Sequence, residues 1–329
     1  MIPLPLGRFP TPVQRVDALS NARSTLWVKR DDATHDVYGG NKVRKLEWLL
    51  AEAKERGSTR VVTVGAAGSH HVLATTYFGK RAGIVVEAVL VPQPRTEHVL
   101  EVLRAGIGLG LKAFPVGSWS AAPWALARRV ASGARLITVG GSSVTGTMGY
   151  LQAARELAAQ VRRGELPEPD VCVVALGSGG TAGGLAAGFE AEGMRTRVVG
   201  VCVSTPPWVL ERTALRLAGA SLRRAGIAAG EPMRTRLSMD VRFLGEGYGF
   251  VTMAGNEATV VAKEGAGLTL DPTYTAKAFA SALWHVRARR APNVLYWHTL
   301  SSAPMAPLLA AAPAEDVLDA RLRALALLR

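Results

Sequence analysis

Short apolar runs alternate with longer amphipathic stretches from about residue 60 onward. The short runs have the length and β-branched content of buried strands, whereas the longer stretches repeat apolar positions at helical spacing. The predicted strands are RVVTVGAA at 60–67, IVVEAVLV at 84–91, LKAFPV at 111–116 and ARLITVGG at 134–141. The predicted helices among them cover 70–81, 97–104, 124–130 and 146–163. This alternation favours a parallel sheet with helices on its faces.

A proline-rich and acidic segment, GELPEPD at 164–170, breaks the pattern and indicates a linker. The alternation then resumes, with strands predicted at 171–177, 196–203 and 293–299 and helices predicted from Thr181 and across 207–224. At 329 residues the chain is also long for a single core. We therefore predict an α/β protein with two lobes, each a mostly parallel twisted sheet flanked by helices, and a ligand-binding cleft between them.

The net charge of +13 raises the question of a nucleic-acid partner. The 31 arginines and 8 lysines are dispersed along the whole chain, without a dense basic run, an aromatic-interleaved patch or zinc-finger spacing. We therefore expect no nucleic-acid partner. A small anionic ligand accounts better for the excess of positive charge.

The N-terminal sequence MIPLPLGRFPTP lacks the charged and apolar regions of a signal peptide. No stretch reaches the roughly 18 apolar residues that a membrane helix needs. The only cysteines, Cys172 and Cys202, lie in predicted strands and are too few for a disulfide framework or a four-cysteine zinc site. We expect a cytoplasmic protein with no membrane partner and no metal.

The segment Gly39–Glu47, GGNKVRKLE, is the first with candidate chemistry. Its two glycines permit a tight turn, and Asn41 is a good N-cap for the helix that follows. Lys42 then lies in the first turn, where the positive end of the helix dipole lowers the pKa of an amine. A Schiff-base lysine needs such a lowered pKa, although a solvated surface lysine would give the same sequence.

A glycine-rich segment, Gly177–Gly184, follows a predicted strand and opens a predicted helix. Its backbone N–H groups can therefore converge on a phosphate. It also fits the dinucleotide fingerprint G-x-G-x-x-A, which expects an acidic residue at the end of the next strand. Ser204 and Thr205 stand there instead, so a phosphate monoester is favoured. A glycine-rich turn that binds nothing is the remaining alternative.

A third cluster, Gly68-Ser69-His70-His71, directly follows the strand predicted at 60–67. Hydroxyl and imidazole groups at the carboxyl end of a strand lie where an α/β cleft binds its substrate. Two histidines without a third ligand make a poor metal site. A helix cap without further function is the alternative.

Seven motifs follow one another along nearly the whole chain. They are KRDD (29–32), GGNKVRKLE (39–47), GSHH (68–71), VGGSS (139–143), GSGGTAGG (177–184), LDPTYT (270–275) and HT (298–299). In order and spacing they resemble the fold type II, or tryptophan-synthase-β-like, pyridoxal-phosphate enzymes. Within that family the chain is most similar to the branch of D-cysteine desulfhydrases and 1-aminocyclopropane-1-carboxylate (ACC) deaminases.

The resemblance implies that Lys42 carries pyridoxal 5'-phosphate as a Schiff base. The implied cofactor-binding residues are Lys42, Asn41, His70, Gly177, Ser178, Gly179, Gly180, Thr181, Tyr274, Thr275 and Thr299. The implied catalytic residues are Lys42, Ser69, Tyr248 and Tyr274, and the implied substrate-binding residues are Ser69, His70 and His71. The family pattern also implies a homodimer, a large cofactor-binding domain of residues 1–48 and 160–329, and a small α/β domain of residues 49–159.

Three positions bear on the reaction. Thr275 stands where ACC deaminases carry Glu and D-cysteine desulfhydrases carry Thr, beside the pyridine nitrogen, and this favours simple β-elimination over ring opening. The chain departs from the family at His70, where the pattern has an Asn that contacts the cofactor's phenolic oxygen. It departs again at Leu300, where the pattern has a Gly, and this leucine is expected to narrow the substrate pocket.

The predicted function is therefore α,β-elimination and deamination of a small amino acid such as D-cysteine, giving pyruvate, sulfide and ammonia. ACC-type deamination and β-replacement are the alternatives with the same cofactor. Two alternatives belong to other classes. One is an NAD(P)-binding oxidoreductase, and the other is a non-catalytic protein that binds the cofactor only.

Overall fold

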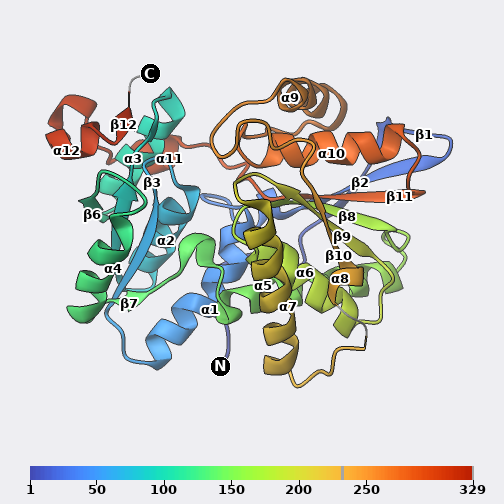
Figure 1. Cartoon of the computed structure of the whole chain (residues 1–329), viewed down its shortest axis with the longest axis horizontal. Coiled ribbons are helices and arrows are strands. Elements are labelled where there is room, and N and C mark those ends of the chain that lie inside the picture. The colour runs from blue at the N-terminus through green and yellow to red at the C-terminus, as the bar shows by residue number, and fades with distance from the viewer. Residues whose placement is uncertain (231–232, 328–329) are drawn as a thin grey trace. The chain divides into compact units, whose positions relative to one another are not determined.

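The computed structural model describes residues 1–230 and 233–327, which form two compact units (Figure 1). Unit 1 consists of residues 1–6, 46–141 and 303–327, and unit 2 consists of residues 7–45 and 142–302. The division falls within helix α1 (Asn41–Glu55), after Lys45. Each unit has its own sheet, so the α/β class and the two mostly parallel sheets predicted from the sequence are confirmed.

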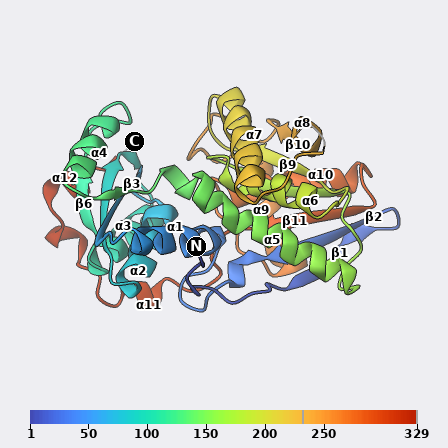
Figure 2. The same cartoon turned by 90° about the horizontal axis from the view of Figure 1, so that it is seen from below.

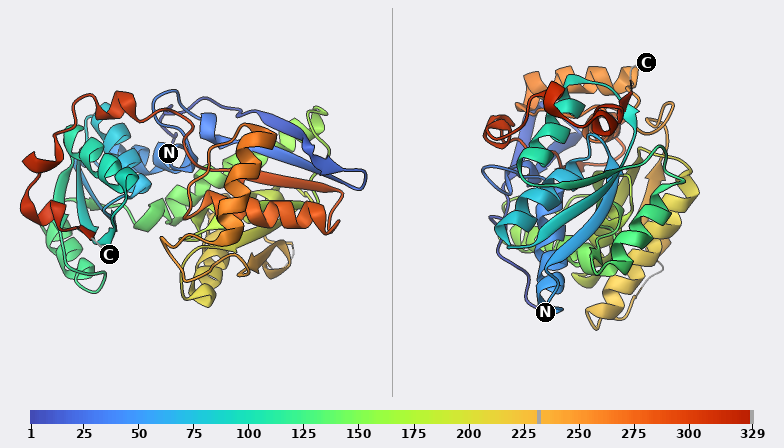
Figure 3. Two further views of the ribbon diagram at one scale, coloured as in Figure 1. Left: turned by 90° about the horizontal axis from the view of Figure 1, so that it is seen from above. Right: turned by 90° about the vertical axis from the view of Figure 1, so that its left-hand side faces the viewer.

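Unit 1 is built on a four-stranded parallel sheet in the order β6-β4-β3-β7. Its strands are β3 (Arg60–Ala66), β4 (Val85–Val91), β6 (Lys112–Pro115) and β7 (Arg135–Leu136). Its other helices are α2 (His70–Arg81), α3 (Glu97–Gly108), α4 (Ala122–Ala131), α11 (Ala306–Leu309) and α12 (Ala320–Arg323), shown in the right-hand view of Figure 3. The central strands β3 and β4 are buried almost throughout, as expected for parallel strands covered on both faces.

The C-terminal segment packs within unit 1. Strand β12 (Ala326–Leu327) pairs in parallel with β5 (Gln93–Pro94), and Arg104 Nε donates to the carbonyl of Pro313 at 2.7 Å. The sequence-based domain boundaries assign this segment to the larger domain, because no local pattern signals that the chain returns to strand β5. Those boundaries stay a prediction.

Unit 2 is built on a six-stranded sheet in the order β1-β2-β11-β8-β9-β10. Its strands are β1 (Val13–Asn21), β2 (Ser24–Arg30), β11 (Asn293–His298), β8 (Val171–Leu176), β9 (Arg197–Cys202) and β10 (Leu237–Asp240). Only the edge pair β1 and β2 is antiparallel, and all other neighbours are parallel. A parallel sheet of this kind needs helices on both faces.

Two helical layers cover that sheet. One contains α9 (Met253–Ala266) and α10 (Thr275–Arg287), and the other contains α5 (Val144–Arg162), α6 (Gly180–Ala191) and α7 (Pro207–Arg224), as Figures 1 and 2 show. Strand β8 has buried side chains towards both layers. Val171 and Val173 pack with the α9–α10 core, whereas Cys172 and Val174 pack with the α5–α7 core. The short helix α8 (Met233–Arg236) precedes β10.

The sequence pattern predicts α2 and α7 residue for residue. The strand predicted at 134–141 is wrong beyond Leu136, because Val139–Gly141 form a short 3₁₀ segment in which Gly140 and Gly141 adopt positive φ angles of 61° and 66°. Both cysteines are free and buried. Across residues 1–230 and 233–327, no helix is both long and apolar enough to cross a membrane.

Candidate active site

Lys42 lies in the first turn of α1, as predicted. The prediction that Asn41 caps this helix is wrong, because Asn41 is its first residue. Its backbone N–H donates to the carbonyl of Thr299 at 3.1 Å. Its side chain bonds Lys42 and Thr181 instead of a backbone N–H of the helix. Gly40 has a φ of 90°, and a Cβ there would lie 2.7 Å from the same carbonyl oxygen. Only glycine fits this close approach without strain.

The Lys42 amine is held by its neighbour in sequence. Lys42 Nζ donates to Asn41 Oδ1 at 2.8 Å. Burial lowers the pKa of this amine to about 8, although the carboxylate of Asp271 acts in the opposite direction. At that value about a tenth of the amine is uncharged at pH 7, far more than for an ordinary lysine, and only the uncharged amine is a nucleophile or a base.

The glycine-rich loop lies between β8 and α6. Gly179 has a φ of 88° and turns the chain into the helix. The backbone N–H of Gly180 donates to Ser142 Oγ at 3.1 Å, and Ser142 Oγ lies 2.8 Å from Ser178 Oγ. A Cβ at Gly180 would lie 2.6 Å from Ser142 Oγ, so the glycine keeps this position open. Hydroxyl groups thus gather at the positive end of α6, which is the arrangement that binds phosphate groups.

Lys45 is a residue of this site that the sequence reasoning missed. It lies one turn after Lys42, and its side chain is only 2% exposed. Lys45 Nζ donates to Ser142 Oγ at 3.3 Å and would lie 3.1 Å from a Cβ at Gly180. Burial, followed by the charge of Lys42, lowers the pKa of the Lys45 amine well below its ordinary value. The i, i+3 spacing of two lysines on one helix face was the available signal.

The start of α1 meets the start of α6 within unit 2. Asn41 Nδ2 donates to Thr181 Oγ1 at 3.3 Å, while Asn41 Oδ1 accepts the hydrogen bond from Lys42. One side chain therefore joins the reactive amine to the glycine-rich loop. The sequence analysis names all three residues, and the structure brings them together.

Two tyrosines lie beside the same loop. Tyr274 OH donates to Tyr248 OH at 3.0 Å, and the two rings meet edge to face. A Cβ at Gly177 would lie 2.9 Å from Tyr274 Cε1, so the ring packs directly on the beginning of the loop. Burial raises the pKa of both hydroxyls, and both are protonated at neutral pH.

Thr275 begins helix α10 and is bound to Asp271. Thr275 Oγ1 donates to Asp271 Oδ2 at 2.6 Å and accepts from the backbone N–H of Asp271 at 2.6 Å. The backbone N–H groups of Thr273 and Tyr274 donate to Asp271 Oδ1, so this carboxylate holds the turn that leads into the helix. The Thr275 side chain is 1% exposed. Its hydroxyl is thus oriented by a carboxylate that the sequence analysis did not single out.

The Ser-His-His cluster lies in unit 1, at the carboxyl end of β3. Ser69 caps α2, and its Oγ accepts from the backbone N–H of Val72 at 3.4 Å. His70 Nε2 lies 2.9 Å from His98 Nε2. His71 is 5% exposed, and its Nε2 lies 2.9 Å from Thr63 Oγ1 on β3. Because the His71 ring is buried and bonded to Thr63, its predicted contact with substrate has the least support of the three.

Comparisons with known proteins agree with this geometry. A family described as pyridoxal-phosphate dependent enzyme matches residues 4–299. A D-cysteine desulfhydrase of Salmonella newport is 32% identical over 305 residues, which cover 88% of this chain and 91% of that protein. The crystal structure of an ACC deaminase homologue superposes with a TM-score of 0.79 at 27% identity, covering 94% of this chain and 96% of the other.

A more distant structure shares the fold alone. The processed form of threonine deaminase isoform 2 from Solanum lycopersicum has a TM-score of 0.64 at 16% identity and covers 92% of this chain and 82% of its own. The NAD(P)-dependent alternative finds no support in these matches. The match over residues 4–299 and the desulfhydrase relative at 32% identity place this chain in the family of pyridoxal-phosphate-dependent enzymes.

Proposed function

We propose that this chain is a lyase that eliminates the β-substituent of a small amino acid, with D-cysteine as its substrate. D-Cysteine and water are consumed, and pyruvate, hydrogen sulfide and ammonia are formed. The observation that carries the proposal is the position of Lys42. Its amine has a pKa of about 8. Hydrogen bonds through Asn41 join it to the glycine-rich loop at the start of α6, which has the form of a phosphate-binding loop.

The residues of unit 2 fit pyridoxal 5'-phosphate. The N-terminus of α6, the hydroxyls of Ser142 and Ser178 and the amine of Lys45 are suitable donors for a phosphate dianion. The ring of Tyr274 lies against the same loop. When bound, the cofactor supplies an electron sink for negative charge at the substrate's α-carbon. The backbone amides of residues 177–181 are the proposed phosphate contacts.

Lys42 is the proposed covalent anchor and base. With cofactor and substrate bound, the uncharged form of Lys42 Nζ would be able to take the α-proton of the substrate. Asn41 Oδ1 holds that nitrogen at 2.8 Å and limits its positions. Ser69 and His70 of unit 1 are proposed to contact substrate and cofactor, as the resemblance implies.

Tyr248 is the proposed donor of a proton to the leaving sulfur. Because Tyr274 OH donates to Tyr248 OH, the hydrogen of Tyr248 is directed to a further acceptor. Burial keeps both hydroxyls protonated by raising their pKa values. A thiolate leaves more readily when a proton is delivered to it.

We expect replacement of Thr275 by glutamate to change the cofactor's absorbance spectrum and to depress elimination about tenfold or more, equivalent to one strong hydrogen bond. The carboxylate would replace a hydroxyl that bonds Asp271 at 2.6 Å and would set two negative charges together. Thr275→Ser, which keeps the hydroxyl, is the matched control. Pyruvate release and the visible spectrum are measured for both. Equal spectra and rates for Thr275→Glu and the wild type would contradict the assigned position of this residue.

A product assay tests the reaction itself. The purified protein is incubated with D-cysteine, L-cysteine and ACC, and sulfide, ammonia and the 2-oxo acid are measured. We expect sulfide and pyruvate from D-cysteine and little 2-oxobutanoate from ACC. Rapid turnover of ACC with inert D-cysteine would overturn the proposed reaction and would favour the deaminase alternative.

The lowered pKa of Lys42 predicts how cofactor capture depends on pH. Below about pH 8 the amine is mostly protonated and does not attack the cofactor's aldehyde, so the capture rate should fall about tenfold per pH unit. Above pH 8 the rate should level off. Stopped-flow absorbance of cofactor-free protein mixed with pyridoxal phosphate measures this profile. A rate that keeps rising to pH 10 would show an ordinary lysine instead.

Two further expectations belong to the proposal. A cytoplasmic location is one of them, as expected from the sequence. A homodimer is expected from the family pattern, and size-exclusion chromatography with light scattering would measure it.

A further inference from the structure

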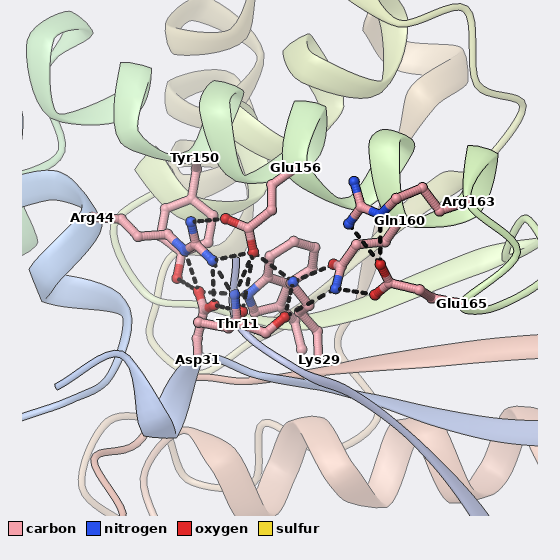
Figure 4. A network of polar contacts seen from close by, with 10 residues as sticks. Thr11, Lys29, Asp31, Arg44, Tyr150, Glu156, Gln160, Arg163 and Glu165 are labelled. Atoms are coloured by element: carbon pink, nitrogen blue, oxygen red, sulfur yellow. Dashed lines mark hydrogen bonds and ion pairs between the residues drawn. The ribbon is translucent and has the colours of Figure 1, made fainter. Parts of the chain in front are cut away.

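A network of buried charges lies in unit 2 next to the first turn of α1 (Figure 4). Lys29, Asp31, Arg44 and Glu156 form its centre, and their side chains are between 0% and 12% exposed. Lys29 Nζ lies 2.6 Å from Glu156 Oε1, and Arg44 lies 2.9 Å from the other oxygen of Glu156. Two positive and two negative charges therefore balance within the core.

The carboxylate of Asp31 accepts from four different residues of the network. Arg44 grips its carboxylate with two nitrogens, Nε at 2.9 Å and Nη2 at 2.8 Å. Tyr150 OH and Trp297 Nε1 each donate to Asp31 Oδ2 at 2.7 Å. Thr11 Oγ1 donates to Oδ1 at 2.9 Å. Burial alone would raise the pKa of Asp31, but Arg44 holds it below its ordinary value, and the group stays ionised.

Asp31 contacts the chain on both sides of Lys42. Its backbone carbonyl accepts from the N–H of Gly40 at 2.9 Å, two residues before the lysine. Its carboxylate accepts from Arg44, two residues after the lysine. One residue thus fixes the position of the turn from which the Lys42 side chain extends.

Stability alone gives little reason for this arrangement. A buried ion network costs much desolvation, and apolar residues of the same size are often equally stabilising or better. Directional bonds from several donors, by contrast, fix a group in one place. The network lies beside the turn that carries Lys42, whose position matters for the proposed chemistry.

We propose that Asp31 is a positioning residue for Lys42, which it acts on through Gly40 and Arg44. This inference rests on the proposed role of Lys42 as cofactor anchor. It extends that role to a residue that touches neither the Lys42 amine nor the glycine-rich loop in the bonds described above. The visible circular dichroism of the bound cofactor reports its orientation and so provides a readout besides activity.

The test compares two isosteric variants of the cofactor-loaded protein, Asp31→Asn and Glu156→Gln. Each removes one carboxylate charge from the same network, and each weakens a contact of Arg44. Both variants keep the bond from Gly40 to the Asp31 carbonyl. Only Asp31→Asn, however, weakens the hold on Arg44 Nε and the bonds from Tyr150 and Trp297. Melting temperatures are measured first, and comparisons are made at a temperature at which both variants are folded by far-ultraviolet circular dichroism.

We expect Asp31→Asn to lower kcat about tenfold or more and to weaken the visible circular dichroism band. Glu156→Gln should stay within about twofold of the wild type in both measurements, whatever its melting temperature. Equal losses in the two variants, or a wild-type band and kcat in Asp31→Asn, would overturn the proposal. If Asp31→Asn does not fold, Arg44→Lys replaces it, because lysine keeps the charge but loses the two-nitrogen grip. Arg44→Lys is then expected to show the same loss of kcat and the same weakened band. A wild-type result, or a loss equal to that of Glu156→Gln, would overturn the proposal.

Failure of the proposed role of Lys42 and failure of the proposed role of Asp31 give different experimental results. If Lys42 is not the anchor, borohydride reduction leaves its peptide unlabelled in the wild type, and the proposed function fails. If Lys42 is labelled but Asp31→Asn and Glu156→Gln behave alike, only the inference about Asp31 fails.

Discussion

Replacing Lys42 by alanine should lower turnover at least about a thousandfold, as expected when the base of a proton transfer and the covalent anchor are removed together. The phosphate-binding groups are untouched, so the variant should still bind the cofactor without a covalent bond. Its absorbance should then resemble that of free pyridoxal phosphate. Turnover of D-cysteine and the visible spectrum of the purified variant are the measurements.

Lys54→Ala is the matched control for this variant, because Lys54 is an exposed lysine of the same helix. It should keep the turnover and the spectrum of the wild type. Substantial turnover in Lys42→Ala would contradict the account, since no other described residue is assigned the role of anchor.

Replacing Lys45 by methionine should weaken cofactor binding about ten- to hundredfold, the usual value of a hydrogen bond to a charged group. The same change should make the cofactor-free protein more stable. The folded-state pKa of Lys45 lies well below its ordinary value, so the charged form is disfavoured by folding. That penalty is present in full below the folded-state pKa and disappears as pH rises past the unfolded value.

Titration calorimetry with pyridoxal phosphate and thermal unfolding of the cofactor-free protein at pH 7 measure the two effects. A loss of cofactor affinity together with a gain in the stability of the cofactor-free protein identifies Lys45 as an anion-binding lysine. Loss of a structural lysine would lower the stability instead. Lys54→Met is the control and should change neither. An unchanged affinity in Lys45→Met would remove Lys45 from the phosphate site.

Local patterns predict the elements whose signals are local. Helices α2 and α7 could be placed because amphipathic spacing and their flanking Ser, Pro and Arg residues mark both ends. The edge strands β1 and β10 and the strand β2 next to β1 are not predicted from the sequence. Strand β2 pairs with its sequence neighbour β1 and with the distant β11, and β10 pairs with β9. The pairings with β11 and β9 span long sequence distances and have no local signature.

The sequence predicts those parts of the candidate site that have a local sequence motif. Lys42 follows two glycines at a helix start, and Gly177–Gly184 joins a strand to a helix. Lys45, Ser142 and Asp271 gain meaning only from contacts that the fold creates. His71 shows the converse case, since its neighbours in sequence suggested a binding residue and the structure pairs its ring with Thr63 on β3.

Borohydride reduction of the purified protein, followed by tryptic digestion and mass spectrometry, tests the central claim most directly. Reduction fixes the cofactor to its lysine, and trypsin does not cut after a modified lysine. The account predicts the added mass on the peptide of residues 31–44, in which Lys42 is the only lysine. The added mass on Lys45 or Lys277, with residues 31–44 unlabelled, would contradict it.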